Sequence, residues 1–77
     1  MNKARRKKIE GIQAKLEELK SLLEEVRDEE QEAYDNMPES LQESERGENM
    51  YDGIDNLEQA INSFEEIDEY LQEVVDQ

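Results

Sequence analysis

The sequence predicts an all-α protein whose two long helices fold back on each other as an antiparallel hairpin. Apolar residues recur at alternating steps of three and four in two long segments, which is the spacing of an amphipathic helix. The only proline, Pro38, separates these segments, and proline interrupts helices. We therefore expect one domain over residues 1–77. It should comprise a helix over about 3–35, a turn over about 36–43 and a helix over about 44–75.

The first helical segment carries an apolar seam that weakens toward the turn. Leu22 widens the seam by one position, and Glu30 and Ala33 continue its register with less apolar side chains. Charged residues of both signs fill the other faces at spacings that suit ion pairs along a solvated helix. The seam comprises Ile9, Ile12, Leu16, Leu19, Leu23 and Val26.

Pro38 marks the end of the first helix. The residue before a proline avoids helical geometry, so Met37 should not be helical and the helix should end near residues 35–36. Pro38 itself suits the first turn of a new helical segment, which predicts a short helical turn over about residues 38–42. We expect Met37 and Leu41 to close this end of the core.

Polar residues around the turn are spaced as helix caps. Asn36 with Glu39, and Ser40 with Glu43, have the spacing of an N-terminal capping box, although only the second pair begins with a serine. Ser44 is expected to cap the second long helix, because serine hydroxyls accept hydrogen bonds from the first N–H groups of a helix.

The second helical segment carries a wider apolar stripe than the first. A second column lies beside its main register at Ile54, Ile61 and Val75, interrupted by Asp68. Two tyrosines flank the stripe, where a ring can be half-buried with its hydroxyl in water. The main register comprises Met50, Gly53, Leu57, Ala60, Phe64, Ile67, Leu71 and Val74, and the flanking tyrosines are Tyr51 and Tyr70.

A stripe of this width predicts self-association. It covers about three positions in seven, as expected for a helix that packs against more than one neighbour. A single hairpin has one internal interface and would leave part of the stripe exposed. We therefore expect two copies to share a core as a homodimeric four-helix bundle with antiparallel helices.

Composition limits the chemistry that the chain can perform. It contains no histidine and no cysteine, so zinc, copper and iron–sulfur sites are not expected, and neither is a cofactor. The carboxylates lie mostly on solvated faces where nothing would tune their pKa, so we do not expect an enzyme. Glu30 and Asp68 are the two acids in seam positions; they sit there either as weak points of the seam or as ligands of a hard cation.

The net charge of −14 argues against binding to nucleic acids or anionic membranes and favours a basic protein partner. Residues 1–8 are basic but are followed by no signal-peptide core, and no run approaches the about 20 apolar residues of a membrane span. We therefore expect a cytoplasmic protein. The basic residues of 1–8 either form a nucleic-acid-binding arm or, in a hairpin, lie beside the acidic residues of 65–77 and neutralise them.

The turn resembles a motif of small helical-hairpin proteins from Gram-positive bacteria and their phages and mobile elements. The residues that carry the resemblance are 35–42 (DNMPESLQ) and 44–47 (SERG), followed by 55–61 (DNLEQAI) in the second helix. The similarity extends from about residue 10 onward. That family has no assigned activity, so the resemblance implies a helical hairpin and a mobile-element origin, and no reaction.

Three functions are compatible with the sequence. The first is a non-enzymatic interaction module that acts by protein–protein contact. The second is an inhibitor that mimics nucleic acid, because residues 28–77 contain 18 acidic residues against one arginine. The third is a binder of a small ligand such as a nucleotide, at the polar turn. The partner-binding residues expected at the turn are Asn36, Pro38, Ser40, Gln42, Ser44 and Arg46. The alternative for these residues is that the serines are only caps and Arg46 only pairs with a neighbouring glutamate.

Overall fold

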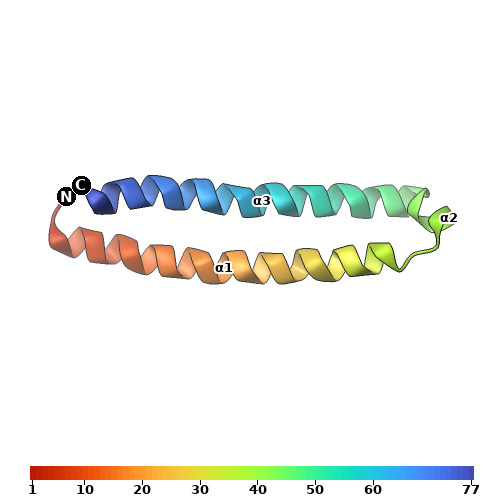
Figure 1. Ribbon diagram of the computed structural model, residues 1–77, viewed down its shortest axis with the longest axis horizontal. Coiled ribbons are helices and arrows are strands. Elements are labelled where there is room, and N and C mark those ends of the chain that lie inside the picture. The colour runs from red at the N-terminus through yellow and green to blue at the C-terminus, as the bar shows by residue number, and fades with distance from the viewer.

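The computed structural model describes all 77 residues and consists of helices and short connections (Figure 1). A long helix α1 (Lys3–Asp35) is followed by a short helix α2 (Glu39–Gln42) and a second long helix α3 (Glu45–Asp76). The two long helices lie side by side, with α2 at one end of the molecule and both termini at the other (Figure 1). The predicted all-α class and the contact between the long helices are therefore confirmed. The molecule is a rod of 58 × 15 × 12 Å.

Asparagine residues terminate α1 at both ends. The Oδ1 atom of Asn2 accepts a hydrogen bond from the Arg5 N–H group at 2.9 Å, and so satisfies one of the N–H groups that a helix start leaves without a partner. The Asn36 N–H group donates to the Glu32 carbonyl at 3.0 Å and closes the last turn.

No helix is sufficiently long and apolar to cross a membrane.

Pro38 and Ser44 start the two helices that follow. The Pro38 carbonyl accepts hydrogen bonds from the N–H groups of Leu41 at 2.9 Å and Gln42 at 3.0 Å, which closes the single turn of α2. The Ser44 hydroxyl oxygen accepts a hydrogen bond from the Gly47 N–H group at 3.3 Å, so the predicted cap of the second long helix is confirmed.

The two capping boxes predicted within the turn are wrong. Asn36 has helical backbone angles and is the C-terminal cap of α1. The N-terminal cap of α2 is Pro38, whose ψ of 147° is extended. Ser40 lies inside α2, and its side chain makes no hydrogen bond, while Glu43 follows α2 as its C-terminal cap. The spacing rule fails here because α2 has only four residues and its start is fixed by the proline.

The contact between α1 and α3 runs along one line of residues on each helix. On α1 the line alternates between an apolar column and a polar column, so the contact uses only half of the predicted seam. Ile54 and Ile61 of α3 are the only buried hydrophobic side chains, at 6% and 5% exposure. The contact line comprises Arg6, Ile9, Gln13, Leu16, Lys20, Leu23, Arg27, Glu30 and Tyr34 on α1, and Met50, Ile54, Leu57, Ile61, Phe64, Leu71 and Val75 on α3.

Two details of the predicted core are corrected by the structure. Met37 is half-buried at the turn, but Leu41 remains about half exposed and does not close the core. The rings of Tyr51 and Tyr70 are mostly exposed rather than half-buried. Tyr51 instead packs at an angle on Tyr34 of α1, with ring centroids 6.2 Å apart, because it lies to one side of the contact line.

The basic start of α1 lies beside the acidic end of α3, as the hairpin requires (Figure 1). The Arg6 guanidinium donates a hydrogen bond to the carbonyl of the last residue, Gln77. No ion pair joins the basic residues 3–8 to an acid of α3; the only ion pair between the helices is Lys20–Glu65. The basic and acidic segments therefore lie close together without fixed ion pairs between them.

Candidate interaction surfaces

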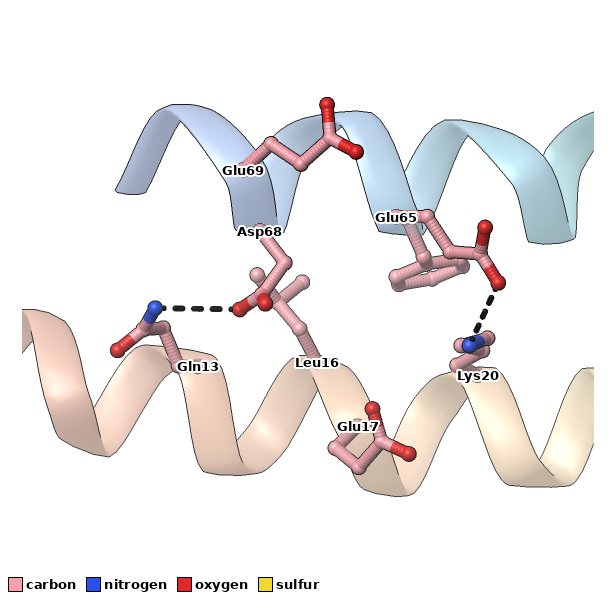
Figure 2. Close-up of a pocket in the computed structure, with 8 residues that line it drawn as sticks. Gln13, Leu16, Glu17, Lys20, Glu65, Asp68 and Glu69 are labelled. Carbon is pink, nitrogen blue, oxygen red and sulfur yellow. Dashed lines mark hydrogen bonds and ion pairs between the residues drawn. The ribbon is translucent and has the colours of Figure 1, made fainter. Parts of the chain in front are cut away.

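One side of the hairpin, here called the polar side, carries the polar contacts between α1 and α3. The Gln13 side-chain amide donates to Asp68 Oδ1 at 3.1 Å and to Gln72 Oε1 at 3.2 Å, and Lys20 Nζ donates to Glu65 Oε1 at 3.0 Å. Figure 2 shows two of these bonds bridging the helices. The polar side comprises Glu17, Glu24 and Gln31 of α1, with Glu58, Glu65 and Gln72 of α3.

The Lys20–Glu65 ion pair sets the electrostatics of a shallow hollow on this side. The hydrogen bond that Lys20 donates to Glu65 raises the pKa of Lys20 above its ordinary value and outweighs desolvation, which lowers it. The hollow has a volume of about 250 Å³. Four carboxylates line the hollow, and only that of Glu65 is bonded to this single ammonium group (Figure 2). No group of three acids on the molecule is arranged to hold a metal ion. The hollow comprises Gln13, Leu16, Glu17, Lys20, Phe64, Glu65, Asp68 and Glu69.

The opposite side of the hairpin, here called the apolar side, has no such polar bridges. Glu17 shares a hollow with Glu65, and Gln31 shares one with Tyr51 and Glu58, so these residues lie on one side. Each long helix also has a column of residues on the other flank of its contact line. These two columns therefore meet on the opposite side of the hairpin. The apolar side comprises Ile12, Leu19, Leu22 and Val26 of α1, with Gly53, Ala60, Ile67 and Val74 of α3.

The apolar side is the part of the predicted seams that the hairpin leaves at the surface. Ile12, Leu19, Leu22, Val26 and Ile67 are each 44% to 56% exposed. The whole chain exposes 5988 Å², whereas a compact folded protein of 9.1 kDa exposes about 4,900 Å². The excess of about 1,100 Å² exceeds the about 800 Å² that each partner buries in an interface of standard size.

Most of the six predicted turn residues hold the turn together. Asn36 and Pro38 end one helix and start the next. The Gln42 side-chain amide donates to the Tyr34 carbonyl at 2.9 Å and so caps a carbonyl at the end of α1. The Ser44 hydroxyl donates to the Leu41 carbonyl while it accepts from α3. The side chains of Gln42 and Ser44 therefore use their polar atoms within the chain.

Asn36, Ser40 and Arg46 are the predicted turn residues whose polar side chains make no hydrogen bond within the chain. All three are exposed, and Arg46 forms no ion pair. Arg46 borders a shallow hollow of about 470 Å³ together with Glu30 and Glu45. A phosphate bound there would lie beside these carboxylates, which repel it. The arrangement therefore suits contact with a protein surface better than capture of a nucleotide.

Gly47 lies in the first turn of α3 and packs against α2, a contact that the resemblance of residues 44–47 does not specify. It is buried, and a Cβ atom at this position would overlap the carbonyl oxygens of Gln42 and Leu41. Its φ is not positive, so the requirement is for close approach of α2 rather than for an unusual backbone conformation. No family model, curated protein or solved structure matches the chain.

Proposed function

We propose that this protein is a small, non-enzymatic interaction module that works as a homodimer and acts by protein–protein contact. The observation that carries the proposal is the row of half-exposed aliphatic residues along the apolar side. Exposed apolar patches of this kind mark protein–protein interaction sites in soluble proteins. A four-helix bundle made from two hairpins supplies the missing half of the core. An origin in a phage or mobile element agrees with the resemblance of the turn.

Sedimentation equilibrium tests the dimer. The native chain should have twice its formula mass of 9.1 kDa, and Leu19→Gln should raise the dimer dissociation constant by roughly tenfold or more because a leucine is lost from both copies. Leu41→Gln is the matched control, since Leu41 is equally exposed but lies at the turn. A native chain that stays monomeric at every concentration contradicts the proposal.

A second contact, with a different protein, is proposed at the turn. Ser40 and Arg46 have side chains free to bind it, and Arg46 is the only basic residue after Arg27. Affinity capture from host lysate with the native protein and with a Ser40→Ala/Arg46→Ala variant tests this contact. A partner that the native protein captures and the variant loses supports the contact at the turn. A partner that both proteins capture places the contact on the long helices instead.

A nucleic-acid mimic is the second candidate, favoured by the number of acids without an ion pair. The sequence has 23 acidic residues, of which only Asp28 and Glu65 form ion pairs. Such a surface suits a basic groove that normally holds DNA or RNA, for example that of a defence nuclease. Replacing the acids in successive clusters should weaken such binding progressively, and added salt should abolish it. Loss confined to one residue contradicts mimicry.

A further inference from the structure

The face of α3 that is turned away from α1 by about a quarter turn contains no acidic residue. This is unusual because α3 has 11 acids among its 32 residues. All 11 of these acids lie on the other faces of the helix. The acid-free face comprises Arg46, Asn49, Gly53, Asn56, Ala60, Ser63, Ile67, Tyr70, Val74 and Gln77.

The middle of this face is lined by small side chains and its C-terminal end by large ones. Ser63 lies at the centre, with Asn56 seven residues before it and Tyr70 seven residues after it. If an identical helix packed antiparallel with Ser63 against Ser63, Asn56 of one copy would lie opposite Tyr70 of the other. On either side of the Ser63 pair, Ala60 of one copy would then lie near Ile67 of the other, and no carboxylate would face another across the interface.

The corresponding face of α1 has the same kind of symmetry, with Leu22 at its centre. Lys15 lies seven residues before Leu22 and Glu29 seven residues after it. An antiparallel copy of α1 would therefore pair Lys15 of each chain with Glu29 of the other and place the two Leu22 side chains together. The whole helix follows this pattern. Residues 3–20 hold seven basic and three acidic side chains, and residues 24–35 hold seven acids and one arginine.

The two centres lie at the same level along the rod. Lys20 is opposite Glu65 in the hairpin, with Nζ and Oε1 3.0 Å apart. Because the helices are antiparallel, two residues further along α1 corresponds to two residues back along α3, which places Leu22 level with Ser63. One two-fold axis can therefore pass through both Leu22 of α1 and Ser63 of α3.

We propose that a second copy of this chain covers the apolar side with its turn at the opposite end, so that α1 packs on α1 and α3 on α3 about a two-fold axis at Leu22 and Ser63. This inference rests on the proposed dimer and specifies its geometry. The alternative, with both turns at one end, would place each α1 on the partner's α3. It would set Lys15 opposite Tyr70 rather than opposite a carboxylate, and it would bring together the two acidic turn regions.

Single-cysteine cross-linking tests this geometry in the full chain, which has no native cysteine. Under mild oxidation Leu22→Cys should give a covalent dimer in high yield, because residues on a two-fold axis come within the about 4.4–6.8 Å between Cα atoms that a disulfide needs. Ser63→Cys should behave in the same way. Ser21→Cys is the matched control, since Ser21 is exposed and points away from the apolar side.

The possible outcomes distinguish failure of the antiparallel geometry from failure of the dimer itself. A native chain that sediments as a monomer overturns the proposed dimer. A native dimer in which Leu22→Cys cross-links no better than Ser21→Cys overturns the antiparallel geometry alone. A disulfide that forms only when Leu22→Cys and Ser63→Cys chains are mixed would assign the turns to the same end and also overturn it.

Charge reversal supplies an independent readout. Lys15→Glu and Glu29→Lys should each raise the dimer dissociation constant, by roughly threefold to tenfold, because each change places like charges together at two symmetric positions. The double variant Lys15→Glu/Glu29→Lys restores both pairs with reversed polarity and should return the constant to near the native value. Losses that simply add in the double variant contradict the proposed pairing.

Discussion

Gly47 at the start of α3 packs directly against the carbonyl oxygen of Gln42 at the end of α2. This approach folds the short helix onto the long one and lets Ser44 cap α3 while it donates to Leu41. The turn between the long helices is therefore a packed unit rather than a loose connection.

Gly47→Ala should destabilise the protein by about 1–3 kcal/mol, because the added methyl group would displace backbone atoms that have no room to move. Gly11→Ala is the control: nothing lies within 4 Å of a Cβ atom there, and alanine in a helix interior is favoured over glycine by about 1 kcal/mol. Urea unfolding at a fixed protein concentration measures both effects. Equal free energies of unfolding for the two variants would show that α2 is not packed as described.

Ser44→Ala and Gln42→Ala should each lower the free energy of unfolding by about 1 kcal/mol. The first removes the cap of α3, and the second leaves the Tyr34 carbonyl without its side-chain donor. Ser40→Ala should have no measurable effect, because the Ser40 side chain makes no hydrogen bond within the chain. Thermal unfolding followed by circular dichroism compares the three variants. A Ser40→Ala variant as unstable as the other two contradicts this assignment of roles.

The pKa of Lys20 should lie above that of an ordinary lysine and should fall toward it in Glu65→Gln. The cause is the hydrogen bond between the Lys20 ammonium group and the Glu65 carboxylate. Because the folded-state pKa is raised, the stabilisation is fully present below the unfolded-state pKa of about 10.4 and disappears as pH rises through the folded-state value. NMR titration of the lysine side chains measures the shift. A Lys20 pKa that does not respond to Glu65→Gln rules out the ion pair in solution.

Self-association should strengthen as salt is added. Each chain carries a formal charge of −14, and screening reduces the repulsion between two such chains while the apolar contact is unaffected. Sedimentation at about 0.05 M and about 0.5 M NaCl gives the two dissociation constants. A dimer that weakens with salt would indicate that ion pairs, and not aliphatic side chains, dominate the interface.

Much of the fold could be predicted from the sequence because its signals are local. The apolar periodicity gives the two long helices, Pro38 gives the interruption and Ser44 gives the start of α3. Inside the turn the capping rules predicted the wrong N-terminal caps. Asn36 and Ser40 had the spacing of a capping box, but Pro38 fixed the start of α2. The role of Gly47 depends on contact between α2 and α3, which no local pattern encodes.

The candidate surface was harder to predict, because two adjacent columns of each stripe are apolar and either could face the other helix. In the hairpin, Leu16 and Leu23 of α1 turn toward α3 together with the polar column of Gln13 and Lys20. Leu19 lies on the flank and stays half exposed. Hydrogen bonds across the hairpin favour this rotation, since Gln13 and Lys20 find partners on α3 only when they face it.

The most direct test of the dimer and its geometry is the distance between two spin labels attached through Ser40→Cys, one on each copy. Ser40 is exposed and forms no side-chain hydrogen bond, so a label there should leave the fold unchanged. A two-fold axis at Leu22 places each label about 25 Å along the rod from the axis, and the pair should therefore be about 50 Å apart. A short separation, with both turns at one end, or the absence of any coupling between copies would contradict the account.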